Sequence, residues 1–145
     1  MQNSNRSKNY TSLEKWADLI TNKEFSFVNL QYNVHMDEIL AKGDITRNFL
    51  NTNFLDQWDD LEGVISLISN LDYVVSTSAS PSMLASSVGV PTLIFSTINK
   101  DWLGRSQRFD QHPLFAKTSI YPTIDAENDK KIVPEITSWL EKKFL

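Results

Sequence analysis

The chain has 145 residues, 41% of them apolar and 22% charged, which suits one globular domain with a substantial core and argues against wholesale disorder. Its net charge of −4 argues against a general nucleic-acid binder, which needs an excess of basic side chains. No apolar run is long enough for a membrane span, and the polar start lacks the apolar middle of a secretion signal. The absence of cysteine excludes disulfides and thiolate metal sites. It also suits the cytoplasmic location that we expect.

The first half of the chain predicts a polar tail, helices and one clear strand. A polar tail over residues 1–10 precedes a helix that Thr11 and Glu14 cap, and a strand follows at 25–30. A short helix over 36–41 ends at Gly43, and a short strand is expected around Phe54 and Leu55. Asp59 and Glu62 form a second capping box, which opens a helix whose inward residues are Val64, Ile65, Leu67 and Ile68.

The second half alternates short apolar runs with helices. The first elements expected here are a strand at 72–76, a helix at 81–88, a strand at 92–96 and a polar loop at 97–112. An edge strand follows at 119–121, and Pro122 closes it. The last helix starts near Pro134, and its residues at helical spacing are Ile132, Ile136, Trp139 and Leu140. Such alternation is typical of βαβ units. We therefore predict an α/β fold with a parallel sheet in one compact domain.

The hydroxyl-rich loop between the strand at 72–76 and the helix at 81–88 is the main candidate site. In a parallel sheet, ligands bind outside the carboxyl ends of the strands, where this loop lies. Ser80 is expected to cap the helix ahead of Pro81, and the unpaired N–H groups and dipole of a helix start attract anions. Small hydroxyl side chains surround this point and would let a phosphate approach the backbone: Ser76, Thr77, Ser78, Ser80 and Ser82.

The loop has no glycine, so it is neither a P-loop nor a GxGxxG fingerprint. The alternative is that these serines only cap the helix and fill a tight turn, and the layout alone does not decide between the two.

Other candidate residues carry weaker signals. Asp59 and Asp60 resemble an acid–base pair, but capping accounts for Asp59. His35 and His112 have no neighbouring carboxylate pattern, so we expect surface positions rather than metal ligands or bases. No Ser-His-Asp order or GxSxG elbow supports hydrolysis by an activated serine.

The polar loop at 97–112 contains cations and a tryptophan. Lys100, Arg105 and Arg108 follow a strand that ends at the same sheet edge as the serine loop, so a cation could fold onto a bound phosphate. Solvated loop charges are the more ordinary explanation. Trp102 either plugs the core or offers a flat face to a base.

Short segments of one enzyme family occur nearly end to end, in the family's order and spacing: Asn5-Arg6-Ser7, Phe27-Val28-Asn29-Leu30-Gln31-Tyr32, Asp60-Leu61-Glu62-Gly63, Leu71-Asp72-Tyr73-Val74-Val75-Ser76, Leu84-Ala85, Gly89-Val90-Pro91 and Asp101-Trp102. The chain thereby resembles the donor-binding half of GT-B glycosyltransferases. It is most similar to bacterial tetratricopeptide-repeat proteins with a heptosyltransferase-like C-terminal domain.

The resemblance implies a Rossmann-like three-layer domain over residues 11–145, with a nucleotide-diphosphate sugar bound before the helix at 81–88. The hydroxyl groups that would hold the diphosphate, with the adjoining amides, are those of Thr77, Ser78, Ser80 and Ser82. Trp102 and Arg105 would flank the nucleotide. The resemblance implies no metal and no cofactor besides the donor substrate.

The chain departs from the family where the chemistry lies. Members usually carry Asp or Asn and then His four residues on, in a pattern like N-x-x-x-H-L-A-G, whereas Ala79 and Met83 occupy these places and Ser86 replaces the glycine. A thioether donates no hydrogen bond to a phosphate, so anion binding would depend on backbone and serine groups. A later W-Y-P motif with a following arginine aligns with Leu114-Phe115-Ala116 and with Lys117 or Pro122.

The family's domain begins with a strand and a Gly-rich turn ahead of the segment that matches Asn5-Arg6-Ser7, and nothing before Asn5 predicts them. The family's cleft also lies between two domains, of which this chain supplies one wall. We therefore expect a fragment or degenerate relative whose cleft and sheet another domain or chain completes, with catalytic residues outside this chain.

Two alternatives stay open. The loss of the family's His and Asn favours a non-catalytic interaction module with a decayed site, and a missing first strand would leave apolar edges that pair with another chain. A flavodoxin-like receiver or FMN binder shares the layout but lacks the acidic cluster of a receiver. The sequence does not specify the sugar, the base or the acceptor.

Overall fold

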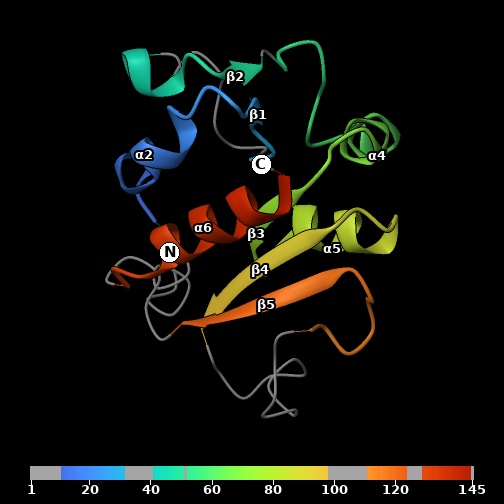
Figure 1. Cartoon of the computed structure of the whole chain (residues 1–145). Helices are drawn as coiled ribbons and strands as arrows, with labels where there is room; N and C mark the ends of the chain where they lie inside the picture. The colour runs from blue at the N-terminus through green and yellow to red at the C-terminus, as the bar shows by residue number, and fades with distance from the viewer. Residues whose placement is uncertain (1–10, 32–40, 51, 98–110, 124–128, 145) are drawn as a thin grey trace, which may run out of the picture. The chain divides into compact units, whose positions relative to one another are not determined.

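The computed structural model describes residues 11–31, 41–50, 52–97, 111–123 and 129–144 (Figure 1). These ranges form helices and parallel strands in two small sheets, so the α/β prediction is confirmed. The chain divides into two compact units, Ser12–Ser66 and Leu67–Leu145 together with Met1–Thr11. No helix in the described ranges has both the length and the apolar character that crossing a membrane requires. The predicted polar tail lies outside the described residues.

The unit Ser12–Ser66 is built around a two-stranded parallel sheet. Its elements are η1 (Leu13–Trp16), α2 (Ala17–Ile20), β1 (Phe27–Val28), η2 (Gly43–Thr46), β2 (Phe49–Leu50) and the first turns of α4 (Leu61–Ser69). Phe27 pairs with Phe49, and the two ring centroids lie 5.7 Å apart. Asn48 donates its side-chain amide to the carbonyls of Ile20 (3.0 Å) and Asn22 (3.1 Å), which ties β2 to the end of α2.

Two predictions for this unit need correction. The strand expected around Phe54 and Leu55 is wrong: the strand is Phe49–Leu50, because it is Phe49 that pairs with β1, and Phe54 lies in a turn with 79% of its surface exposed. The first helix begins as a 3-10 turn with Ser12 as its N-cap residue, not Thr11. The helix predicted at 36–41 falls almost entirely outside the described residues.

The helix α4 begins where predicted, but a different aspartate caps it. The Asp60 carboxylate accepts the Gly63 N–H at 2.8 Å, so Asp60, not Asp59, holds the helix start. The reason is the preceding turn, in which the Asp56 carboxylate accepts the N–H groups of Trp58 (2.9 Å) and Asp59 (3.1 Å) and so places Asp60 at the N-cap position, directly before Leu61. These two N–H donors also lower the pKa of Asp56.

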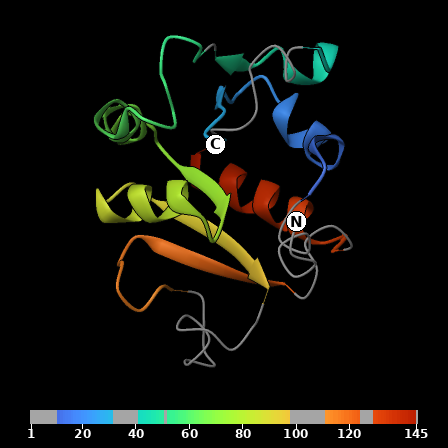
Figure 2. The same cartoon turned by 180° about the vertical axis from the view of Figure 1, so that it is seen from behind.

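The unit that starts at Leu67 contains the larger sheet, with the strand order β3-β4-β5 and every pair parallel. Its elements are β3 (Val74–Thr77), α5 (Ser80–Ser87), β4 (Thr92–Thr97), β5 (Thr118–Thr123) and α6 (Ile132–Phe144). Figures 1 and 2 show α5 and α6 on opposite faces of this sheet. The predicted strands at 72–76 and 92–96 and the helices at 81–88 and near Pro134 are therefore confirmed.

Alternation of side chains along β5 explains why a helix covers each face. The Thr118 hydroxyl donates to the Ser86 hydroxyl of α5 at 2.8 Å, whereas Tyr121 lies on the other face, where the Glu135 carboxylate of α6 raises its pKa. Burial of apolar side chains between these layers is the main stabilising term. The buried apolar residues of this unit include Leu93, Ile94, Phe95, Ile132, Ile136 and Leu140.

The edge strand β5 extends further than predicted, because Pro122 pairs with Ser96 inside the strand instead of ending it. At its start, the Thr118 N–H donates to the Phe115 carbonyl (3.1 Å) and the Thr118 carbonyl accepts the His112 N–H (2.7 Å). The segment 111–116 therefore folds along the outer edge of β5.

The link from α5 to β4 is a Schellman turn at Gly89. The Val90 N–H donates to the Ala85 carbonyl at 3.0 Å, and the Gly89 N–H donates to the Ser86 carbonyl at 3.2 Å. Gly89 has φ +79°, a left-handed conformation that glycine adopts without steric cost.

Candidate functional site

The serine loop lies where the topology of a parallel sheet predicts a ligand site. The strand β3 ends at Thr77, Ser78 and Ala79 form the turn, and α5 begins at Ser80 and leads to the neighbouring parallel strand β4. The loop is therefore at the carboxyl ends of the strands. Ala79 has an extended backbone (φ −141°, ψ 173°) and is the N-cap residue, so the prediction that Ser80 caps the helix is wrong. Ser80 is instead the first helical residue.

Because Ala79 has no side-chain acceptor, Ser82 stabilises the turn from inside the helix. Its hydroxyl lies 2.9 Å from the Thr77 carbonyl and 2.7 Å from the Ala79 carbonyl, and it donates to one or the other. The same hydroxyl accepts the Ala79 N–H at 3.2 Å. This is half of a capping box, in which the third helical residue reaches back to the N-cap N–H. Ser82 is fully buried, so its hydroxyl offers no surface to a ligand and belongs to the turn.

The rest of the loop is open to solvent. Ser78, Ala79 and Ser80 are exposed, while Thr77 is half-buried. Pro81 has no N–H and the Ala79 N–H is used by Ser82. The N–H groups of Ser80 and Ser82 are then the first-turn donors for which the described residues supply no acceptor. Because Ser82 is fully buried, the open helix start combines the Ser80 amide, the exposed hydroxyl groups of Ser78 and Ser80, and the positive end of the dipole.

Ser86, which stands where members of the resembled family carry glycine, has a structural role in this chain. Ser86 is buried, donates its hydroxyl to the Ser82 carbonyl at 2.7 Å and accepts the Thr118 hydroxyl. This chain of hydrogen bonds joins the serine loop to β5 and keeps the start of α5 in place.

Five other candidate residues lie outside the described residues: His35, Lys100, Trp102, Arg105 and Arg108. The surface position expected of His35, and the contacts expected of the other four with a bound nucleotide or phosphate, remain predictions.

His112 is not the surface residue that the sequence suggested. Its side chain is buried, its ring lies 4.8 Å from that of Phe115, and its Nδ1 accepts the Leu114 N–H at 3.1 Å. Burial lowers the pKa of His112, so the imidazole is neutral at pH 7. Within the described ranges, no group of three or more His, Cys, Asp or Glu side chains could hold a metal ion.

The tyrosines of the larger sheet are also poor acid–base groups at neutral pH. Burial, with the carboxylates of Asp129 and Glu135, raises the pKa of Tyr121 to about 12. Burial alone raises the pKa of Tyr73, whose ring packs on that of Trp139 with the ring centroids 4.4 Å apart. Both side chains therefore stay protonated and act in packing.

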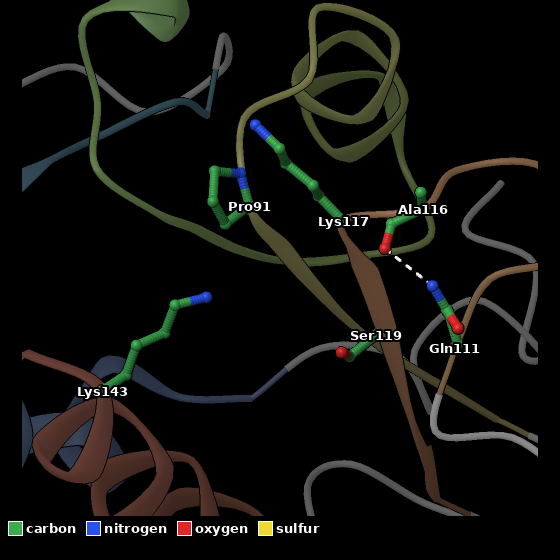
Figure 3. A pocket seen from close by; sticks show the side chains of 6 residues that line it. All are labelled: Pro91, Gln111, Ala116, Lys117, Ser119 and Lys143. Carbon is green, nitrogen blue, oxygen red and sulfur yellow. Dashed lines mark hydrogen bonds between the residues drawn. The ribbon is translucent and has the colours of Figure 1, made fainter.

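A concave surface lies at the amino ends of β4 and β5, away from the serine loop, and the sequence analysis did not identify it. It is a hollow of about 580 Å³ lined by Pro91, Gln111, Ala116, Lys117, Ser119 and Lys143 (Figure 3). The i, i+2 spacing of Lys117 and Ser119 on a strand could have indicated a shared face. Nothing local indicates that Lys143 joins them.

Comparison of the chain with protein-family models, with curated proteins and with solved structures finds no match. The resemblance to GT-B glycosyltransferases therefore rests on the sequence segments alone.

Proposed function

We propose that this chain is the donor-binding half of a GT-B type glycosyltransferase, as a fragment or degenerate relative, and that it binds a nucleotide-diphosphate sugar. The observation that carries the proposal is the exposed turn Ser78-Ala79-Ser80 at the carboxyl edge of parallel strands, opening directly into α5. The ordered family segments add the choice of ligand. A Rossmann-like arrangement of the complete domain is part of this proposal.

In this proposal the diphosphate binds at the first turn of α5. The hydroxyl groups of Thr77, Ser78 and Ser80 donate to its oxygens, and the N–H group of the exposed Ser80 completes the site. Trp102 and Arg105 flank the nucleotide. Because Met83 replaces the family's histidine, no imidazole contributes, and the catalytic residues come from another domain or chain that completes the cleft.

Calorimetric titration of the full chain with UDP, ADP and GDP sugars tests this proposal. The informative variant is Ser80→Glu, because a carboxylate at the exposed first helical position favours the helix dipole and repels a diphosphate. We expect Ser80→Glu to keep the fold and abolish binding. Ser87→Glu, the same change at the exposed far end of α5, is the matched control and should bind as the wild type does. A folded wild type that gives no heat with any sugar nucleotide at millimolar concentration refutes the proposal.

A second candidate function, a protein-interaction module, is favoured by one surface of the unit Ser12–Ser66. Three large apolar side chains follow each other at short spacing and stay exposed: Phe54 (79%), Trp58 (67%) and Leu61 (56%). The carboxylates between and beside them are Asp56, Asp59, Asp60 and Glu62, and no basic residue lies between Asn51 and Ser66. Exposed aromatic anchors with an acidic surround suit a basic, partly apolar segment of another protein.

An amphipathic Lys/Leu peptide is a suitable probe for this surface. Binding should quench or shift tryptophan fluorescence in the wild type and weaken strongly in Trp58→Ser. The same peptide with Glu in place of Lys should not bind. If Trp58→Ser binds the peptide as the wild type does, or the wild type does not bind it, the interaction function loses its support.

A further inference from the structure

The hollow at the amino ends of β4 and β5 lies at the opposite edge of the larger sheet from the serine loop. Pro91 directly precedes β4 and Lys117 directly precedes β5, whereas Thr77 and Ser78 follow the carboxyl end of the parallel strand β3. Lys143, in the last turn of α6, reaches this amino edge and lines the hollow. The hollow is therefore distinct from the site of the proposed function.

Three hydrogen-bond donors line the hollow, namely Lys117, Ser119 and Lys143. Lys117 and Ser119 are two residues apart on an extended chain and so point to the same side, which is the side of α6. Figure 3 shows the Lys143 side chain extending from α6 toward Pro91 and the Ser119 hydroxyl pointing to the side from which Lys143 comes. The described residues that line the hollow include no carboxylate, although the chain as a whole has a net charge of −4. The hollow is thus locally positive.

In the part of the chain that the structure describes, these donors have no acceptor. Neither Lys117 nor Lys143 forms an ion pair, and the Ser119 hydroxyl makes no hydrogen bond. Lys42 is different, because its ammonium group lies 2.9 Å from a Glu14 carboxylate oxygen.

Aromatic rings support Lys143 without neutralising it. Its Nζ lies 4.9 Å from the ring centroid of Tyr73 and 5.0 Å from that of Trp139. A ring face occupies one side of the ammonium group and leaves other N–H donors for an anion. The side chain is thereby held near the rim of the hollow.

We propose that this hollow binds the phosphate group of a phosphate monoester. Such a group carries a charge of about −1.5 to −2 at pH 7, which matches two lysines, whereas a carboxylate matches one. One of its three terminal oxygens also accepts from the Ser119 hydroxyl. The open hollow, with a volume of about 580 Å³, has room for a phosphate group.

Amide NMR shifts of the ¹⁵N-labelled full chain test the proposal. Inorganic phosphate and phenyl phosphate are added at constant ionic strength, with acetate as the carboxylate comparison. We expect saturable shifts at Lys117, Ser119 and Lys143 with both phosphates, and weaker or no binding of acetate. Binding should strengthen as the pH rises through about 6, where the phosphate gains its second charge. A parallel arm with phosphatidylcholine vesicles, with and without phosphatidic acid, distinguishes a lipid phosphate from a soluble one.

Three substitutions separate the proposed site from general charge effects. Lys117→Gln and Lys143→Gln should each weaken phosphate binding about tenfold, as the loss of a charged hydrogen bond does. Lys142→Gln is the matched control, since it removes a lysine from the same helix turn but not from the hollow, and it should bind as the wild type does. If Lys143→Gln does not fold, Lys117→Gln alone makes the comparison. The proposal is overturned if the wild type shows no saturable shift, or if Lys117→Gln and Lys142→Gln bind phosphate equally.

Discussion

Replacing Ser82 by alanine tests how the serine loop keeps its shape. In the structure the Ser82 hydroxyl donates to the carbonyl of Thr77 or Ala79 and accepts the Ala79 N–H, and the side chain is fully buried. Alanine fits the same space but leaves these backbone groups without that partner. We expect Ser82→Ala to lower the free energy of unfolding and to leave the fold unchanged.

The magnitude follows from counting the contacts. One donated and one accepted hydrogen bond, each with a net value of about 0.5–1.5 kcal/mol, give a loss of about 1–3 kcal/mol. Removing a half capping box gives a similar value, about 1 kcal/mol or more. For a chain of this length, a loss of about 2 kcal/mol lowers the melting temperature by about 4–8 °C.

Urea unfolding followed by circular dichroism, together with a thermal melt, measures this loss. Ser80→Ala is the matched control, because Ser80 lies in the same turn with an exposed side chain, and its effect should stay within about 0.5 kcal/mol. If Ser82→Ala is as stable as Ser80→Ala, the hydroxyl does not support the turn, and the division of these serines into structural and ligand-facing residues is refuted.

Three further predictions concern stability. Gly89→Ala should lower the free energy of unfolding by about 1 kcal/mol in urea titrations, because φ is +79° and, since a new Cβ meets no atom within 4 Å, backbone strain is the only cost. Gly89→Asn should lower it by less, and equal stability of all three proteins would contradict this. Thr118→Val removes the donor to Ser86 Oγ and should cost about 1 kcal/mol, while adding Ser86→Ala should cost less than the sum of the single changes, and strict additivity would argue against the coupling. Because burial lowers the pKa of His112, its NMR titration should have a midpoint below 6.5, and a midpoint at or above 6.5 would show that the ring is not desolvated. The stability that the neutral imidazole contributes should be present above pH 6.5 and lost as the pH falls through the lowered pKa.

The elements that local sequence predicts well are those in which neighbouring residues determine the conformation. The strands β3 and β4 are continuous apolar runs, and α5 and α6 begin next to prolines that suit a first helical turn. In contrast, β2 has two residues and exists because Phe49 meets Phe27, which no local pattern shows. Burial of His112 likewise depends on the segment 111–116 folding along β5.

The position of the serine loop in the fold was predicted, but the part that each serine plays in the turn was not. The strand–helix order located the serine loop at the carboxyl edge, because that order alone determines which edge a βα loop occupies. The roles of the individual serines could not be predicted, since Ser80 and Ser82 are chemically alike and only the turn geometry selects Ser82 as the capping hydroxyl. Lys117 and Lys143 line one hollow only because α6 packs back along the sheet.

The outer edge of β5 can form few main-chain hydrogen bonds with a strand from another molecule. Outward main-chain groups alternate along an edge strand, and the bonds of Thr118 to the 111–116 segment identify the outward positions as Thr118, Ile120 and Pro122. The N–H and carbonyl of Thr118 are already used, and Pro122 has no N–H to donate. Between them only Ile120 has an outward N–H to which the described residues supply no acceptor, so a foreign strand could gain one main-chain donor there. This edge is thereby protected against aggregation without any charged residue in the strand.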